Sequence, residues 1–172
     1  MPSEPLNIRS LQDQLQSLSR REGILKWDLG ASRSNSSSVQ VDRGEAKQLK
    51  AAQRSSITIR VWNQQGLVGI TSTSDLSNTG LEKALMGAHQ ASSFGNPDDI
   101  PGFSPLATAP QPDLHRPLQD AQGIQSLLTQ LLDAEKELLS RHPAISTLPY
   151  NAMNEGSSER IYLNSEGALR QA

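Results

Sequence analysis

Three histidines are the first residues to test for metal chemistry, because the chain has no cysteine to supply thiolate ligands. His89, His115 and His142 are separated by 26 and 27 positions, and none has a His or Glu at a spacing that places two ligands on one helical face. We therefore predict no metal site. We interpret His89 as a partly exposed helix residue, and His142 as a residue at a helix carboxyl end, where a positive charge is favourable.

Serines supply the next candidate chemistry, at positions 34, 36, 37 and 38. A serine nucleophile needs a strained turn of the G-x-S-x-G type, and the sequence contains none. We expect these serines to form a polar loop or a bulged edge strand. Gly66 and Gly69 flank a predicted strand and do not open onto a helix, as a phosphate-binding loop would, so we interpret them as structural.

Paired carboxylates occur twice, as Glu135 with Glu137 and as Asp98 with Asp99. Two carboxyl groups can share acid–base work only when their surroundings separate their pKa values. We expect both pairs to be solvent-exposed and structural. The sequence thus offers no candidate catalytic, cofactor-binding or metal-ligating residue.

Composition narrows the class of protein. The 172 residues carry a formal net charge of −2 with scattered Lys and Arg, so a nucleic-acid partner is not expected. The lack of cysteine fits a reducing compartment, and we expect a cytoplasmic protein. No run of about 18 apolar residues is present, so neither a membrane span nor a secretion signal is predicted.

Hydrophobic periodicity predicts a helix over residues 4–22, followed by alternating extended segments. The serine-rich run at 32–38 is expected to interrupt the first of them. Turns are predicted at Asp42-Arg43-Gly44-Glu45 and at Asn63-Gln64-Gln65-Gly66, the second of which closes a hairpin. The expected extended segments are residues 27–31, 39–41, 46–53, 57–62 and 67–72. Together they form an antiparallel meander of about four strands. Trp27 and Trp62 are expected to pack on its faces.

A second helix is expected over residues 78–93, capped by Ser77, and it would cover the sheet together with the first helix. Residues 94–118 are rich in proline, and we expect an extended connection that contacts another part of the protein or joins two units. A strongly apolar helix follows at 119–141. Its stripe from Ile124 to Leu139 is expected to form either the core of a second unit or a face for a partner subunit.

Two further strands, residues 145–154 and 157–164, are predicted around a turn at Asn154-Glu155-Gly156. The resulting fold class is α+β, with an antiparallel sheet and packed amphipathic helices followed by the start of a second α/β unit. The predicted domain organisation is an amino-terminal α+β domain (1–93), a proline-rich connection (94–118) and the start of a middle domain (119–172), which stops as its sheet begins.

Several of these segments, in this order, resemble the amino-terminal portion of the TldD/PmbA family of zinc metallopeptidases. The resemblance spans residues 8–170 and favours the PmbA (TldE) side. Its most telling part is Gly69-Ile70-Thr71-Ser72-Thr73-Ser74-Asp75-Leu76-Ser77, a strand that leads directly into a helix. The other matching segments are Val39–Glu45, Ile57–Val61, Phe94–Asp98, the 119–141 helix and Asn164-Ser165-Glu166-Gly167, which we interpret as a turn at a strand end or part of a substrate passage.

The resemblance implies a cytoplasmic heterodimer with a TldD-type subunit, which cleaves peptides or unfolded proteins and has been linked to modulation of DNA gyrase. In that family the zinc belongs to the TldD-type subunit, on an H-E-x-x-x-H helix that has no counterpart in this sequence. We therefore expect a non-catalytic part that shapes the substrate chamber and the subunit interface, with no cofactor of its own and with a TldD-type subunit or self-association as its assembly.

Two alternatives stay open. The chain is either an amino-terminal fragment, whose continuation would carry a zinc motif, or a shortened relative, so the sequence leaves open whether the whole protein is an enzyme. It could also be an interaction module with no peptidase role, or a partner that modulates gyrase.

Overall fold

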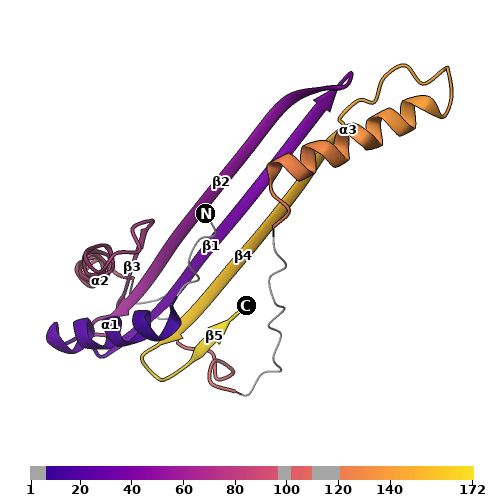
Figure 1. Cartoon of the computed structure of the whole chain (residues 1–172). Coiled ribbons are helices and arrows are strands. Elements are labelled where there is room, and N and C mark those ends of the chain that lie inside the picture. The colour runs from indigo at the N-terminus through magenta and orange to yellow at the C-terminus, as the bar shows by residue number, and fades with distance from the viewer. Residues whose placement is uncertain (1–6, 97–101, 110–120) are drawn as a thin grey trace. The chain divides into compact units, whose positions relative to one another are not determined.

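The computed structural model describes residues 7–96, 102–109 and 121–172, and these residues form an α+β fold (Figure 1). Five strands make one antiparallel sheet in the order β3-β2-β1-β4-β5. The described residues contain these elements: α1 (Ile8–Arg21), β1 (Lys26–Asp42), β2 (Glu45–Trp62), β3 (Val68–Thr73), α2 (Asn78–Ser92), α3 (Ile124–Ser140), β4 (Ala152–Asn164) and β5 (Leu169–Gln171).

The meander is built from longer strands than the sequence predicted. The serine-rich run lies within the 17-residue strand β1, and residues 46–53 and 57–62 belong to the single 18-residue strand β2. Ser34, Ser36, Ser37 and Ser38 are therefore neither a loop nor an edge strand, because β1 lies between β2 and β4. A polar residue does not end a strand when neighbouring strands satisfy its backbone groups.

Two predicted turns are confirmed. Arg43 and Gly44, with φ values of 54° and 79°, connect β1 to β2. Positive φ at both central positions suits a tight hairpin between twisted strands. The hairpin around Gly66 (φ 83°) joins β2 to β3, with Ile57 opposite Thr73 and Trp62 opposite Val68.

The carboxyl-terminal hairpin lies elsewhere than predicted. Asn154-Glu155-Gly156 is not a turn, since all three residues lie inside the continuous strand β4. The turn instead follows β4 at residues 165–168, where the Asn164 side chain accepts hydrogen bonds from the backbone N–H groups of Glu166 (3.1 Å) and Ala168 (2.8 Å). Of the two interpretations of Asn164–Gly167, a turn at a strand end is the one that the structure bears out.

The described residues divide into two compact units, which are described separately. Of the described residues, the first unit comprises 7–33, 54–96, 102–109 and 159–172, and the second comprises 34–53 and 121–158. The five strands belong to one sheet, so a separate second α/β unit with its own sheet is not shown. The predicted domain boundaries at 93 and 118 stay a prediction.

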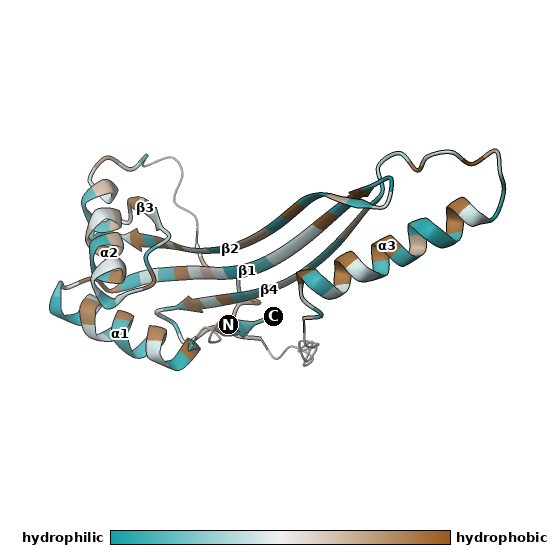
Figure 2. Ribbon diagram, turned by 45° about the horizontal axis from the view of Figure 1, so that its top comes forward, coloured by the Kyte–Doolittle hydropathy of each residue, from teal (hydrophilic) through white to brown (hydrophobic). Residues whose placement is uncertain are grey.

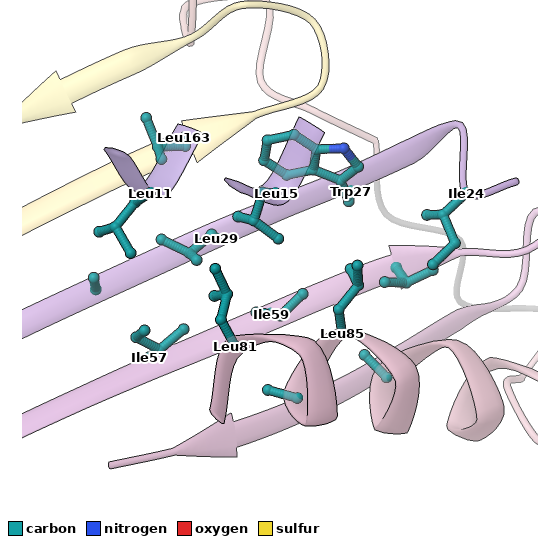
Figure 3. Close-up of a cluster of buried hydrophobic side chains, with 14 of the residues drawn as sticks. Leu11, Leu15, Ile24, Trp27, Leu29, Ile57, Ile59, Leu81, Leu85 and Leu163 are labelled. Carbon is teal, nitrogen blue, oxygen red and sulfur yellow. The ribbon is translucent and has the colours of Figure 1, made fainter. Parts of the chain in front are cut away.

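In the first unit, α1 and α2 supply the apolar side chains that cover one face of the sheet, as predicted. Figure 3 shows leucines of both helices directed toward the alternating residues of β1 and β2. Trp27 is the largest fully buried side chain among the described residues, and its indole N–H donates to the buried hydroxyl of Ser19 at 3.1 Å. The core consists of Leu11, Leu15, Ile24, Trp27, Leu29, Ala31, Ile57, Ile59, Val61, Leu81, Ala84, Leu85, Ala88, Ile161 and Leu163.

Both helices begin at side-chain caps. Asn7 accepts from the Ser10 N–H at 3.0 Å, and Ser77 accepts from the Gly80 N–H at 3.1 Å, as predicted for the second helix. These bonds satisfy backbone donors that the first helical turn leaves without a partner.

Gly69 allows the backbone of β3 to lie close to that of α2. A Cβ at this position would lie 1.9 Å from the Ala88 carbonyl oxygen and 2.3 Å from the Ser92 nitrogen, both backbone atoms of α2. Thr71, two residues along the strand, faces Gly87 of the same helix, where an added Cβ would lie 3.2 Å from the threonine hydroxyl. The interpretation of Gly69 as structural is therefore confirmed.

In the second unit, α3 packs against the carboxyl-terminal part of β1. Leu127 and Leu131 of α3 are buried with Val39 and Val41 of β1, whereas Leu138 is half exposed. Figure 2 shows hydrophobic and hydrophilic residues interspersed along α3. The first half of the apolar stripe on α3 therefore forms a core with β1, whereas Leu138 in its second half is only partly covered.

Glu135 is buried, contrary to the prediction that the Glu135–Glu137 pair is solvent-exposed. Its residue is 2% exposed, and its Oε2 accepts a 2.7 Å hydrogen bond from the Gly44 N–H at the β1–β2 turn. Glu135 follows Leu127 and Leu131 at intervals of four residues, so all three lie on one helical face. Glu137 is exposed and pairs with Arg141.

No helix of the described residues is long and apolar enough to span a membrane.

Replacing Gly69 by Ala should destabilise the first unit by about 2–3 kcal/mol, because the new Cβ meets backbone atoms that cannot rotate away. Urea unfolding followed by the fluorescence of Trp27 and Trp62 measures this change. Gly30→Ala in β1 is the matched control, since nothing lies within 4 Å of its added Cβ, and it should alter stability by less than about 0.5 kcal/mol. Equal stability of the two variants would contradict the close approach of β3 and α2.

Replacing Glu135 by Ala should destabilise the second unit by about 1–3 kcal/mol, because the Gly44 N–H loses its acceptor. Faster hydrogen exchange at the amides of Val39 and Val41 would report this loss. Glu135→Gln keeps a carbonyl acceptor and should lose less than Glu135→Ala. Glu137→Ala removes a carboxylate from an exposed position and should change exchange little; an equal effect of Glu135→Ala and Glu137→Ala would refute this role.

Candidate functional site

A buried polar cluster of the first unit centres on Asp28, whose residue is 3% exposed. The Arg60 Nε donates to both carboxylate oxygens of Asp28, at 2.9 and 3.1 Å, and the Arg60 Nη2 also pairs with Oδ2. The Tyr162 hydroxyl donates to Asp28 Oδ2 at 3.2 Å. Asp28 thus joins side chains from β1, β2 and β4, with its charge neutralised by a forked guanidinium.

The positions of these side chains follow from strand alternation. Asp28 lies between the core residues Trp27 and Leu29, and Arg60 lies between the core residues Ile59 and Val61. Successive side chains of a strand point to opposite faces, so the cluster lies on the sheet face opposite the helices. In the first unit, the core side chains therefore pack on one face of the sheet, and the Asp28–Arg60 ion pair lies on the other face.

Hydrogen bonding to Asp28 raises the pKa of Arg60 above its ordinary value. Burial raises the pKa of Tyr162, and the neighbouring Asp28 charge raises it further. Both groups are therefore held in their protonated forms. Because the Asp28 carboxylate accepts from side chains of two neighbouring strands, the arrangement is suited to holding three strands together.

Aromatic side chains continue this polar cluster. The Trp62 and Phe103 rings lie 5.0 Å apart at 80°, in edge-to-face contact. The Lys26 Nζ lies 5.0 Å from the Trp62 ring centre and 4.8 Å from that of Phe103, which are favourable cation–π distances. Trp62 is buried, so the interpretation of Trp27 and Trp62 as packing residues is confirmed.

Part of the proline-rich connection contacts this same region. Phe103 packs on Trp62, and the Arg170 guanidinium of β5 donates to the carbonyl oxygens of Leu106 (3.5 Å) and Ala109. The prediction that the connection contacts another part of the protein is confirmed for residues 102–109. Asp98, Asp99 and His115 lie outside the described residues.

The other predicted residues are dispersed. His89 is partly exposed in the last turn of α2, as predicted. His142 lies beyond the end of α3 at Ser140, so it is not in the last helical turn; its Nδ1 accepts from the Ala144 N–H at 3.1 Å. His89 and His142 belong to different compact units. The described residues do not fit a zinc site, since no group of three or more His, Asp or Glu among them could hold a metal ion.

The residues of the Asp28 cluster were missed from the sequence. Each is a polar residue at an alternate position of an otherwise apolar strand, which normally indicates a solvated face. The available signal was that an Asp, an Arg and a Tyr occupy such positions next to core residues on three strands. Pairing them required the sheet order, in which β1 lies between β2 and β4.

The segment from Gly69 to Ser77 forms the junction between sheet and helix. Gly69 lies against α2, and the Ser77 N–H donates to Asp75 Oδ1 at 2.9 Å. Hydrogen bonds from Ser77 lower the pKa of Asp75, so this carboxylate stays charged at the start of α2, where the helix dipole favours it. A Cβ at Gly80 would lie 2.4 Å from the Asp75 carbonyl oxygen, so the capping turn requires a glycine there.

The raised pKa of Tyr162 predicts a loss of stability at high pH. Its contribution is fully present below the unfolded-state pKa, about 10.0, and is lost as pH rises above that value, because the unfolded chain releases the phenolic proton first. Chemical unfolding between pH 8 and pH 11 should show a steeper decline for the unmodified chain than for Tyr162→Phe. Identical slopes would show that the phenol is not held in its neutral form.

Comparison with known proteins gives a match to a family model over part of the chain and a shared fold. Residues 27–91 match the sequence model of PmbA/TldA metallopeptidase domain 1. This span contains most of β1, the whole of β2 and β3, and nearly all of α2. No curated protein matches the chain.

Three solved structures share the fold at low sequence identity. The TldE protein of Thermococcus kodakarensis superposes with a TM-score of 0.72 at 16% identity, covering 92% of this chain and 36% of that one. A protein of Thermotoga maritima named as a modulator of DNA gyrase gives 0.71 at 15%, covering 96% and 37%. A Bacteroides thetaiotaomicron protein with a similar name gives 0.72 at 16%, covering 95% and 38%.

The chain therefore spans somewhat more than a third of the length of these structures. The match of residues 27–91 and the shared fold confirm that this chain resembles the amino-terminal portion of the TldD/PmbA metallopeptidase family.

Proposed function

We propose that this chain is a non-catalytic, amino-terminal part of a TldD/PmbA-type metallopeptidase that acts on peptides or unfolded proteins. Its role is to shape the substrate chamber and the subunit interface, and the zinc belongs to a TldD-type partner subunit. The observation that carries this proposal is the extent of the fold likeness, which covers 92–96% of this chain but only 36–38% of the relatives. Such an assembly would work in the cytoplasm.

The surface of the second unit supports a role in subunit contact. Its exposed large apolar side chains include Leu138 at 49%, Ile145 at 36% and Tyr150 at 94% exposure. Tyr150 also has a φ of 60°, which a bulky residue rarely adopts. Large exposed apolar side chains occur on both units of the described chain, and we assign those of the second unit to contact with the partner subunit.

The buried polar groups support a positioning role. The Asp28 carboxylate is neutralised by Arg60, and the Glu135 carboxylate binds the Gly44 N–H. Both groups therefore have partners that fix neighbouring strands and helices. In the proposed assembly they give the subunit a defined shape and leave hydrolysis to the partner.

A DNA gyrase-modulating role is the second candidate, because two of the similar structures carry that name. It would require this chain to bind gyrase or to act on a gyrase inhibitor. The same purified chain would then alter DNA supercoiling by gyrase in the absence of a TldD-type subunit.

Mixing the chain with a TldD-type subunit should give a complex in size-exclusion chromatography with light scattering. Peptide cleavage and zinc should be found only in fractions that contain the partner, since the chemistry is assigned to it. A partner with a histidine of its H-E-x-x-x-H helix replaced by Ala should still co-elute but should not cleave. Stoichiometric zinc or cleavage in the chain alone would contradict the assignment.

A matched pair of double variants tests whether the exposed apolar side chains of the second unit contact the partner subunit. Leu138→Ser with Ile145→Ser should weaken the complex by about tenfold or more, because buried apolar anchors carry much of an interface's binding energy. Leu25→Ser with Leu106→Ser removes exposed apolar side chains from the first unit and should leave the affinity unchanged. Equal affinities for both double variants would contradict the assignment of these second-unit side chains to the interface.

A further inference from the structure

Among the residues that the structure describes, no strand pairs with most of the outer edge of β2. β2 extends from Glu45 to Trp62, whereas β3 pairs only with Ile57–Trp62. β3 is the last strand on that side of the sheet, so within the described ranges no strand pairs with the outer edge of residues 45–56. In Figure 1, β3 likewise accompanies β2 only at one end.

This edge is also open on its two faces. Every residue from Glu45 to Arg54 is exposed, in contrast to the buried residues at the other end of the same strand. The run contains neither proline nor glycine, the residues that commonly interrupt an edge. A long exposed edge with free backbone groups is a template for pairing with another extended chain.

The charges of the run indicate which chain would fit. Lys47, Lys50 and Arg54 outnumber the single acidic residue Glu45, within a chain whose formal net charge is −2. A second copy of this edge would bring like charges together, which disfavours self-pairing. The same charges are complementary to an acidic strand.

Strand alternation further defines the partner. Lys47 and Lys50 are separated by an odd number of positions, so their side chains point to opposite faces of the strand. Leu49, which is 48% exposed, lies on the same face as Lys47. A matching strand therefore carries carboxylates on both faces and an apolar residue on one of them.

We propose that residues Glu45–Arg54 of β2 bind an extended acidic segment of another polypeptide by β-strand addition. Backbone hydrogen bonds along the free edge provide the affinity, and Lys47, Lys50 and Arg54 select for carboxylate side chains. This surface goes beyond the proposed role in the peptidase assembly and does not require a TldD-type subunit. Its test can therefore fail or succeed independently.

The test uses the full chain and a fluorescent peptide of about ten residues built on the repeat Glu-Glu-Val-Glu, which places Glu on both faces of the strand and Val on one of them. Fluorescence anisotropy should show binding of this peptide but not of the same peptide with Lys in place of Glu. Hydrogen exchange should slow at amides within Glu45–Arg54 when the acidic peptide is bound. Binding of both peptides with equal affinity would overturn the proposed selection.

Charge reversal by Lys47→Glu with Lys50→Glu should weaken binding of the acidic peptide by about tenfold or more. The control is Lys83→Glu with Lys136→Glu, which changes the net charge equally at exposed positions of α2 and α3 and should leave binding unchanged. Equal weakening by both double variants would show that net charge, and not this edge, attracts the peptide. That result would overturn the proposal.

Proline substitutions test whether outward-pointing backbone N–H groups of β2 bind the peptide. Adjacent N–H groups of a strand point to opposite edges, so Leu49→Pro and Lys50→Pro remove one bond to β1 and one free outward donor. The variant that keeps the circular dichroism spectrum and stability of the parent identifies the outward donor, and it should lose peptide binding. Unchanged binding in that variant, or displacement of the peptide by single-stranded DNA at a lower concentration than by unlabelled peptide, would overturn the proposal.

Discussion

The fold depends on the strict alternation of side chains along β1 and β2. Odd-numbered residues of β1 supply Trp27, Leu29 and Ala31 to one hydrophobic cluster, and Val39 and Val41 to another. A register shift of one residue would expose every one of these side chains, because the side-chain period of a strand is two. The register of a single strand therefore determines the packing of both clusters.

Buried polar groups reinforce this register. Asp28 accepts from Arg60 and Tyr162, so three strands share one carboxylate on the face opposite the helices. Glu135 accepts from Gly44 and ties α3 to the turn that ends β1. A buried carboxylate without such partners would be costly, so these contacts favour one arrangement over alternatives.

Exposed apolar side chains occur in both units, whereas the unpaired length of β2 lies mainly in the second. In the first unit, α1 and α2 pack on one face of the sheet, and the Asp28 cluster with Phe103 lies on the other. The second unit has a core of four buried residues, and it displays apolar side chains and most of the open edge of β2. An open strand edge and exposed apolar side chains are features that another chain can cover.

The sequence by itself determined the elements whose signals are local. The apolar periodicity of α1 and α2, the cap at Ser77 and the glycine turns at Gly44 and Gly66 require only neighbouring residues, and all were predicted. The order of short segments around Gly69–Ser77 was sufficient to predict the family resemblance. The absence of a candidate catalytic residue was also a prediction from sequence alone, and it stays one.

Only the tertiary structure decided the features that depend on distant partners. The serine run of β1 and Asn154–Gly156 of β4 resembled breaks because their residues are polar, yet ladder hydrogen bonds from adjacent strands keep them extended. Glu135 resembled an exposed helix residue, and its burial follows from the Gly44 N–H 91 positions away. The Asp28–Arg60–Tyr162 cluster likewise joins residues up to 134 positions apart, and local patterns cannot encode such pairings because the strand order brings them together.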